Sequence, residues 1–254
     1  MILYLGFDDT DDKDAPMGTG RLVREFIYSL PDEYQAIGVV RHQFPRLDAI
    51  PYTSNNSSAC AIIEMRDVDG LDVLRNLAVK HLQTCCAPGS DPGLCIAPRD
   101  AVDGSLIEFG QTVTGRRVTQ QDAVNQAKNI ELYGLGGTND GIIGACAAVG
   151  LTKFGWCGRF IEFGALRKLG SSPLVRNLNE AGIQVVSVDR DPLVPQASDR
   201  VVNASWLRPS LWAGKPVLQV RGVEPGVWET AHTKRKKQHG AKPDKAVRTP
   251  CTAE

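Results

Sequence analysis

Four aspartates lie within five residues near the start of the chain, in the segment Asp8-Asp9-Thr10-Asp11-Asp12. They follow the apolar run Ile2 to Phe7, which is typical of a buried β-strand. Carboxylates at this spacing repel one another, and a hard divalent cation removes the repulsion. A turn at Thr10 would gather three of them as predicted Mg²⁺ ligands, namely Asp8, Asp9 and Asp11. A solvated acidic loop is the alternative.

A second candidate group follows at Gly18-Thr19-Gly20, where a helix is expected to begin. The free amides and positive dipole end of a helix N-terminus suit a phosphate, and glycine permits close backbone approach. The alternative is that Thr19 is an ordinary N-cap residue. The G-x4-G-K-[ST] nucleotide loop and the protein-kinase motifs are absent from the sequence. The two groups together indicate phosphoryl transfer, which depends on charge neutralisation and positioning.

A glycine-rich segment runs from Tyr133 to Gly141. It could cradle a phosphate or admit a substrate amine, and its predicted substrate-binding residues are Gly137, Asn139 and Asp140. A plain turn between two elements is the alternative. His42 is weighed in the same way, as a phosphate contact or as a surface histidine at a strand end.

Three blocks of sequence resemble one enzyme family. Gly6-Phe7-Asp8-Asp9-Thr10-Asp11, followed by Met17-Gly18-Thr19-Gly20, is similar to the start of archaeal tRNA-Ile agmatidine (2-agmatinylcytidine) synthetases. The stretch from Arg46-Leu47-Asp48 through Ile50-Pro51-Tyr52 to Ala59, and the stretch Asn139 to Ala145, are similar to two later segments of that family. The resemblance spans roughly residues 1 to 155.

This resemblance implies a kinase-like domain that uses ATP to phosphorylate the wobble cytidine of a tRNA, after which the amine of agmatine displaces the phosphate. Asp8, Asp9 and Asp11 would bind magnesium and ATP, and Thr19 would lie at the transferred phosphate. The other residues expected to bind the nucleotide are Thr10, Gly18, Thr19, Gly20, Asn55 and Asn56.

The sequence also departs from the family. Gly18 and Gly20 stand where the family has Cys and a second Thr, and the segment Tyr52 to Ser58 lacks the family's Arg. Counterparts of the family's OB fold and zinc ribbon are not found, so a truncated homologue is expected. The intact acidic cluster favours an enzyme, whereas the missing Arg and the missing tRNA-binding modules favour the alternative class, a non-catalytic nucleotide- or RNA-binding protein that retains the fold.

The elements expected to position these residues are short strands alternating with helices. They predict an α+β protein of two small α/β-sandwich units. Residues 1–115 are predicted to form a kinase-like ATP and magnesium domain, residues 116–225 a ferredoxin-like domain, and residues 226–254 a basic, disordered tail. The main predicted helices are 21–30, 71–82, 106–109, 119–130, 142–151 and 174–181; the predicted strands are 2–7, 34–44, 59–65, 94–97, 184–188 and 217–223.

Overall charge and composition exclude few classes of function. The 254 residues carry a formal net charge of zero, so overall charge gives no argument for nucleic acid or membrane as a partner. Neither a signal peptide nor an apolar run of membrane length is found, which predicts a cytoplasmic protein. The basic run Lys234-Arg235-Lys236-Lys237 could contact RNA or be a solvated terminus. Trp206, Trp212 and Trp228 could stack on bases, although packing is the default expectation.

The sequence therefore predicts an ATP-dependent, magnesium-requiring enzyme that activates an acceptor oxygen by phosphoryl transfer and then couples an amine such as agmatine. The acceptor would be a tRNA, a nucleoside or a small molecule.

Overall fold

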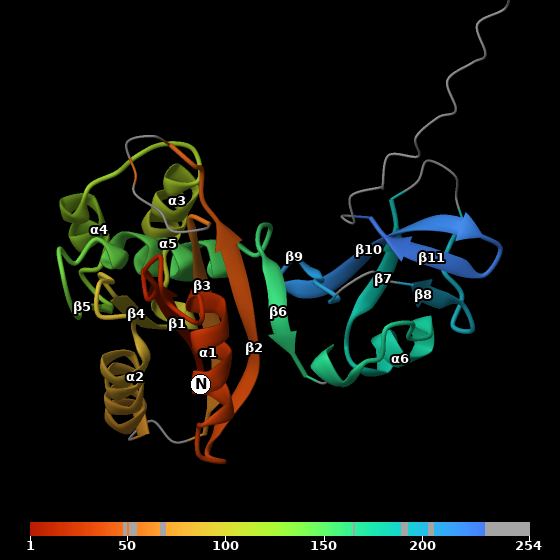
Figure 1. The fold of residues 1–254 in the computed structure, drawn as a ribbon, viewed down its shortest axis with the longest axis horizontal. Helices are drawn as coiled ribbons and strands as arrows, with labels where there is room; N and C mark the ends of the chain where they lie inside the picture. Colours follow the sequence, from red (N-terminus) through yellow and green to blue (C-terminus); the bar gives the residue numbers. More distant parts are fainter. Residues whose placement is uncertain are drawn as a thin grey trace, which may run out of the picture.

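The computed structural model describes residues 1–47, 50, 55–66, 70–164, 166–188, 193–202 and 206–231. They form a mixed α/β fold on one long sheet, with helices on both faces of its first half (Figure 1). The strand order is β5-β4-β1-β3-β2-β6-β9-β10-β11-β8, and β7 pairs with β10. Neighbouring strands are antiparallel except β7 with β10 and β8 with β11. The prediction of a mixed helix-and-strand protein is confirmed.

The strands of the described ranges are β1 (Ile2–Asp8), β2 (Tyr34–Gln43), β3 (Ser57–Met65), β4 (Gly93–Pro98), β5 (Glu131–Gly134), β6 (Arg159–Phe163), β7 (Gln184–Ser187), β8 (Arg200–Val202), β9 (Ser210–Trp212), β10 (Lys215–Glu224) and β11 (Val227–Thr230). The helices are α1 (Thr19–Tyr28), α2 (Leu71–Cys85), η2 (Arg99–Ala101), α3 (Gly104–Val113), α4 (Gln120–Gln126), α5 (Gly141–Phe154), η3 (Leu166–Lys168) and α6 (Val175–Glu180). No helix in these ranges has the length and apolar character needed to cross a bilayer.

Strand β1 lies at the centre of the first half of the sheet and is buried on both faces. Leu3, Leu5 and Phe7 join the core beneath α1 and α2, whereas Tyr4 joins the core beneath α3 and α5. A strand covered on both faces has no polar side, which explains the continuous apolar run that ends at Asp8.

Helix α5 packs unusually close to β1 because small residues line the contact. A Cβ on Gly6 would lie 2.1 Å from the carbonyl oxygen of Ala145, so only glycine fits there. The core beneath α3 and α5 contains Leu106 and Ala147 together, and therefore joins residues from both sides of position 115. The division into domains near residue 115 stays a prediction.

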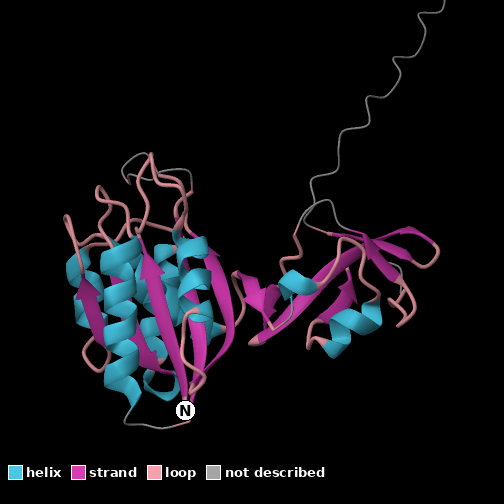
Figure 2. Ribbon diagram, turned by 60° about the horizontal axis from the view of Figure 1, so that its bottom comes forward, coloured by secondary structure: helices cyan, strands magenta, loops and turns pink. Residues whose placement is uncertain are grey.

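The second part of the chain has its own core, formed by α6 and the strands β7, β8, β10 and β11 (Figure 2). Trp228 of β11 is buried in it. The prediction of a tail from residue 226 is therefore wrong for Val227–Thr230, because this strand is too short to show a periodic pattern. Residues 232–254, with the basic run, lie outside the described residues.

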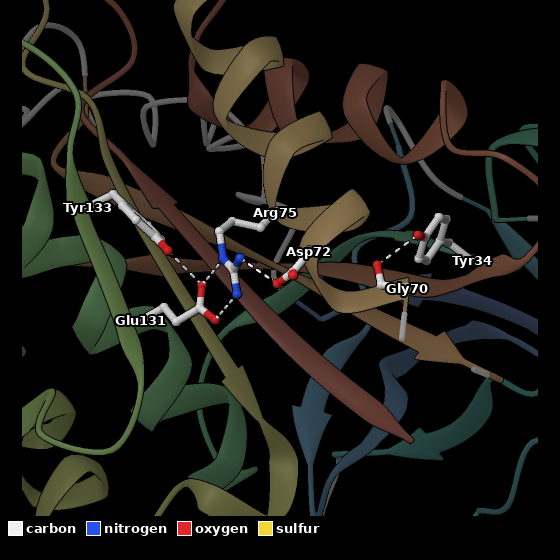
Figure 3. Close-up of polar contacts among 6 residues, drawn as sticks. All are labelled: Tyr34, Gly70, Asp72, Arg75, Glu131 and Tyr133. Carbon is white, nitrogen blue, oxygen red and sulfur yellow. Dashed lines mark hydrogen bonds and ion pairs between the residues drawn. The ribbon is translucent and has the colours of Figure 1, made fainter. Parts of the chain in front are cut away.

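An ion pair between Arg75 and Glu131 connects α2 to the edge strand β5 (Figure 3). The Arg75 guanidinium donates to both oxygens of Glu131 at 2.5 Å, and to Asp72 at 2.6 Å. The Tyr133 hydroxyl donates to Glu131 at 2.7 Å. At the start of α2, the Tyr34 hydroxyl donates to the carbonyl oxygen of Gly70 at 2.8 Å. Helix α2 is thus held at its first turns and against β5, which stands next to β4.

Candidate active site

The acidic segment turns sharply where β1 ends. Asp8 is the last residue of the strand, and Asp9 has a φ of 51°, in the left-handed region that aspartate tolerates better than most residues. Thr10 is buried, and its carbonyl oxygen accepts a hydrogen bond from the Ala87 amide at 3.0 Å. The left-handed residue of this segment is thus Asp9, one position before Thr10.

A chain of hydroxyl groups connects this turn to α1. The Thr10 hydroxyl donates to the Thr19 hydroxyl at 3.0 Å, and the Thr19 hydroxyl donates to Asp11 Oδ1 at 3.4 Å. The N-cap of α1 is Gly18, and no side chain caps this helix. The alternative of Thr19 as an N-cap is therefore wrong, because its side chain bonds the acidic turn instead.

Two further aspartates reach the acidic turn from distant parts of the sequence. The Gly141 amide, at the start of α5, donates to the carbonyl oxygen of Asp91 at 3.1 Å. The Asp91 side chain accepts from Thr138, and the Asp140 side chain accepts from Gln120. Close contact between the start of α5, the end of β1 and the start of β4 therefore brings together the segment after β1 and the loops before β4 and α5.

The electrostatics of the cluster are those of crowded like charges. Burial, followed by the charge of Asp9, raises the pKa of Asp8 to about 8. Burial, followed by the charges of Asp91, Asp11 and Asp140, raises the pKa of Asp9 to about 6. A bound proton or a cation relieves this repulsion.

A cavity of about 920 Å³ opens on the cluster. This volume falls in the range of small-molecule sites, about 300–1,000 Å³. Seven predicted site residues line it: Asp8, Asp9, Asp11, Thr19, Asn55, Asn56 and Asp140. Three cationic side chains, Lys13, Arg116 and Arg117, line the same cavity. Carboxylates and cations therefore face one space large enough for a nucleotide.

The other predicted site residues do not line the cavity, and several have structural roles. A Cβ on Gly20 would lie 2.9 Å from Ile161 Cδ1, so Gly20 allows α1 to pack on the sheet. Gly137 and Asn139 have φ values of 55° and 66°, which identify turn positions. A role of these two residues in substrate binding stays a prediction. Gly18 lies near Asp11, and Thr10 is buried behind the turn.

The described residues fit the predicted Mg²⁺ site only in part. Among the described residues, no three Asp, Glu, His or Cys side chains are placed as a ligand set for one metal ion. Magnesium commonly uses only one or two protein carboxylates and takes its other ligands from water and phosphate oxygens. The donor chemistry of the turn suits that mode of binding, in which the nucleotide completes the ligand set.

Several lining residues of the cavity were not predicted from the sequence, among them Asp91, Arg116 and Arg117. Asp91 belongs to a turn before β4, and Arg116 and Arg117 follow α3. The only signal for Asp91 was its place directly before a strand. His42 is neither of the two expected kinds of residue, a phosphate contact or a surface histidine. It is buried, and its Nε2 lies 2.9 Å from the Thr152 hydroxyl.

The fold of this chain is similar to folds seen in solved structures. No protein-family model matches the chain, and no curated protein matches its sequence. The fold is similar to that of TiaS. Apo TiaS (tRNAIle2 agmatidine synthetase) has a TM-score of 0.50 at 20% identity, over 59% of this chain and 35% of that one.

Two related structures agree with this likeness. The TiaS-tRNA(Ile2)-ATP complex and a structure described as a tRNA fluorescent labeling enzyme each have a TM-score of 0.51 at 22% identity, over 59% of this chain and 36% of the other. The chain thus matches about a third of the length of those structures. The resemblance predicted from the sequence blocks is confirmed at the level of fold.

Proposed function

We propose that this chain is an ATP-dependent, magnesium-requiring enzyme that phosphorylates an acceptor oxygen and then couples the activated carbon to an amine. The observation that carries the proposal is the cavity lined both by Asp8, Asp9 and Asp11 and by Arg116 and Arg117. A polyphosphate needs both kinds of side chain: carboxylates for its cation and cations for its own charge. The likeness to TiaS makes agmatine the first amine to test and tRNA or cytidine the first acceptor.

The residues of this chain have distinct roles in the proposed reaction. Asp8, Asp9 and Asp11 hold Mg²⁺, which would neutralise phosphate charge when bound. Lys13, Arg116 and Arg117 contact phosphate oxygens, and guanidinium groups suit these because they donate in a fixed fork. The Thr19 hydroxyl lies beside Asp11 and is placed to donate to the transferred phosphate. Asn55 and Asn56 line the same cavity and complete the nucleotide site in this proposal.

The chemistry proceeds in two displacements. The acceptor oxygen attacks the γ-phosphorus of ATP, the bond to the bridging oxygen breaks, and ADP leaves with that electron pair. The amine nitrogen then attacks the carbon that bears the new phosphate, inorganic phosphate departs, and the amine loses a proton. In this proposal the first half of the sheet is the kinase-like part, and Asp140 lies near the entering amine.

ADP release tests the proposal directly, measured with magnesium, ATP, agmatine and either bulk tRNA or cytidine. Asp9→Asn is expected to lower the rate about 10²–10³-fold, the usual effect of removing one electrostatic stabiliser of a transition state. Asp14→Asn is the matched control, because Asp14 is exposed and does not line the cavity. Equal rates for wild type and Asp9→Asn would remove the acidic turn from the mechanism. ATP binding without consumption would favour the non-catalytic alternative.

A further inference from the structure

A row of arginines crosses the sheet on the face that α1 covers, where β2, β6 and β9 meet. Arg41 of β2 lies opposite Arg159 of β6 in antiparallel register, so both side chains leave the same face. Arg159 is paired in turn with Ser210 of β9, two residues after Arg208. The Phe160 amide donates to the carbonyl oxygen of Pro209 at 2.8 Å, which fixes Arg208 beside β6.

An exposed aromatic ring continues this row. The Trp206 side chain is 58% exposed. The guanidinium carbon of Arg167 lies 4.1 Å from the centroid of its ring, and that of Arg24 lies 5.9 Å away. The three residues line a second cavity of about 470 Å³, separate from the acidic one. We call these six residues the arginine band: Arg24, Arg41, Arg159, Arg167, Arg208 and Trp206.

The positive charges of the band are largely uncompensated. In the part of the chain that the structure describes, no ion pair involves Arg24, Arg41, Arg159 or Arg208. Arg167 alone has a carboxylate neighbour, Glu162, at 3.8 Å.

The charges of the band affect one another. Burial, followed by the charges of Arg208 and Arg159, lowers the pKa of Arg41. Burial, followed by the charge of Arg208, lowers the pKa of Arg159. Burial and the charge of Arg24 lower the pKa of Arg167, with a smaller contribution from Arg208. Arg208 therefore stands between the two halves of the band.

We propose that the arginine band binds a single-stranded polynucleotide, with the arginines on successive phosphodiesters and an unpaired base stacked on Trp206. Clustered arginines interleaved with an exposed aromatic ring are the two components of such surfaces. A single phosphate would need only part of the band, whereas a chain of phosphates uses its whole length. The binding goes beyond the proposed ATP chemistry and does not depend on it.

Anisotropy of a fluorescein-labelled oligouridylate, titrated with the full-length protein without ATP at several KCl concentrations, tests the band. Arg208→Gln is expected to lower the salt slope by about 0.7, the value for one phosphate contact on a single strand. Trp206→Leu is expected to weaken binding about 5- to 150-fold, because stacking is worth about 1–3 kcal/mol per base and 1.4 kcal/mol is tenfold. Arg99→Gln removes the same charge outside the band and should bind as wild type does.

Melting of each variant confirms that the surface changes leave the fold intact. An oligodeoxythymidylate of equal length separates the two sources of the ligand chemistry. Equal binding of both polymers supports recognition by phosphates and base, and a preference for RNA adds a contact to the 2′-hydroxyl. Wild-type affinity and salt slope in Arg208→Gln, or wild-type affinity in Trp206→Leu, would overturn the proposal.

Discussion

The Asp8 carboxylate lies directly against the backbone of Gly144, where α5 crosses the end of β1. A Cβ built on Gly144 would lie 1.8 Å from Asp8 Oδ2. A carboxylate and a methyl group cannot share that space, so the position of this acid at the cavity depends on a glycine in a helix far along the chain.

Gly144→Ala is therefore expected to displace Asp8 or to push α5 away from the sheet. Overpacking of a core typically costs about 1–3 kcal/mol, and the displaced carboxylate should also lower ADP release. Gly104→Ala is the control, because no atom lies within 4 Å of the Cβ position of Gly104. Normal melting and normal turnover in Gly144→Ala would contradict the role given to this contact.

The Thr19 hydroxyl is expected to matter for turnover rather than for helix capping. Thr19→Ala removes hydrogen bonds to Thr10 and Asp11, which should cost about 1 kcal/mol of stability. Thr19→Ser keeps the hydroxyl and should keep most of the rate of ADP release, whereas Thr19→Ala should lose it. If serine and alanine reduce the rate equally, the hydroxyl has no part in the chemistry.

His42 should make the protein sensitive to acid. Burial lowers its pKa from 6.5 to about 3, so the native state holds it neutral while the unfolded chain takes up a proton. The contribution of His42 to the unfolding free energy is therefore fully present above pH 6.5 and is lost as the pH falls toward 3. The loss is at most about 1.4 kcal/mol per pH unit.

Urea unfolding at several pH values measures this effect. His42→Gln should flatten the decline in unfolding free energy below pH 6.5, the ordinary pKa of histidine. His81→Gln keeps His42 and should keep the wild-type slope. An unchanged slope in His42→Gln would assign the acid sensitivity to other groups.

How much of this could be predicted from the sequence depends on how local each feature is. Asp8, Asp9, Asp11 and Thr19 are close in sequence, and a single turn brings them together, so their grouping was predictable. The main buried strands and amphipathic helices were predictable for the same reason, because periodicity is a local property.

The rest of the site depends on contacts between distant elements. Asp91 reaches the cavity because α5 packs on β1 and β4, and Arg116 because α3 packs on α5; neither contact can be read from the neighbouring sequence. The glycines of residues 133–141 suggested a phosphate loop, whereas several of them serve close packing. Strands β6, β9 and β11 escaped prediction because three to five residues show no distinctive period.

The pair Arg75 and Glu131 should stabilise the fold without affecting chemistry. Hydrogen bonds from Arg75 lower the pKa of Glu131 below 4.5, so its contribution is present above that pH and is lost as the pH falls further. Glu131→Gln should reduce the unfolding free energy by about 1 kcal/mol at neutral pH. Asp72→Asn should have a smaller effect, because Asp72 is 77% exposed. An equal decrease in unfolding free energy in both variants would contradict the larger contribution assigned to the Arg75–Glu131 pair, which is shown in Figure 3.

Calorimetric titration of ATP into the protein with and without magnesium tests the central claim most directly, because it needs no knowledge of the acceptor. Wild-type protein and Asp14→Asn are expected to bind ATP more tightly when magnesium is present. The double variant Asp9→Asn, Asp11→Asn should lose that magnesium dependence, while Lys13, Arg116 and Arg117 retain weaker, metal-independent binding. Magnesium-dependent binding of wild-type strength in the double variant would contradict the assignment of this cavity to magnesium and ATP.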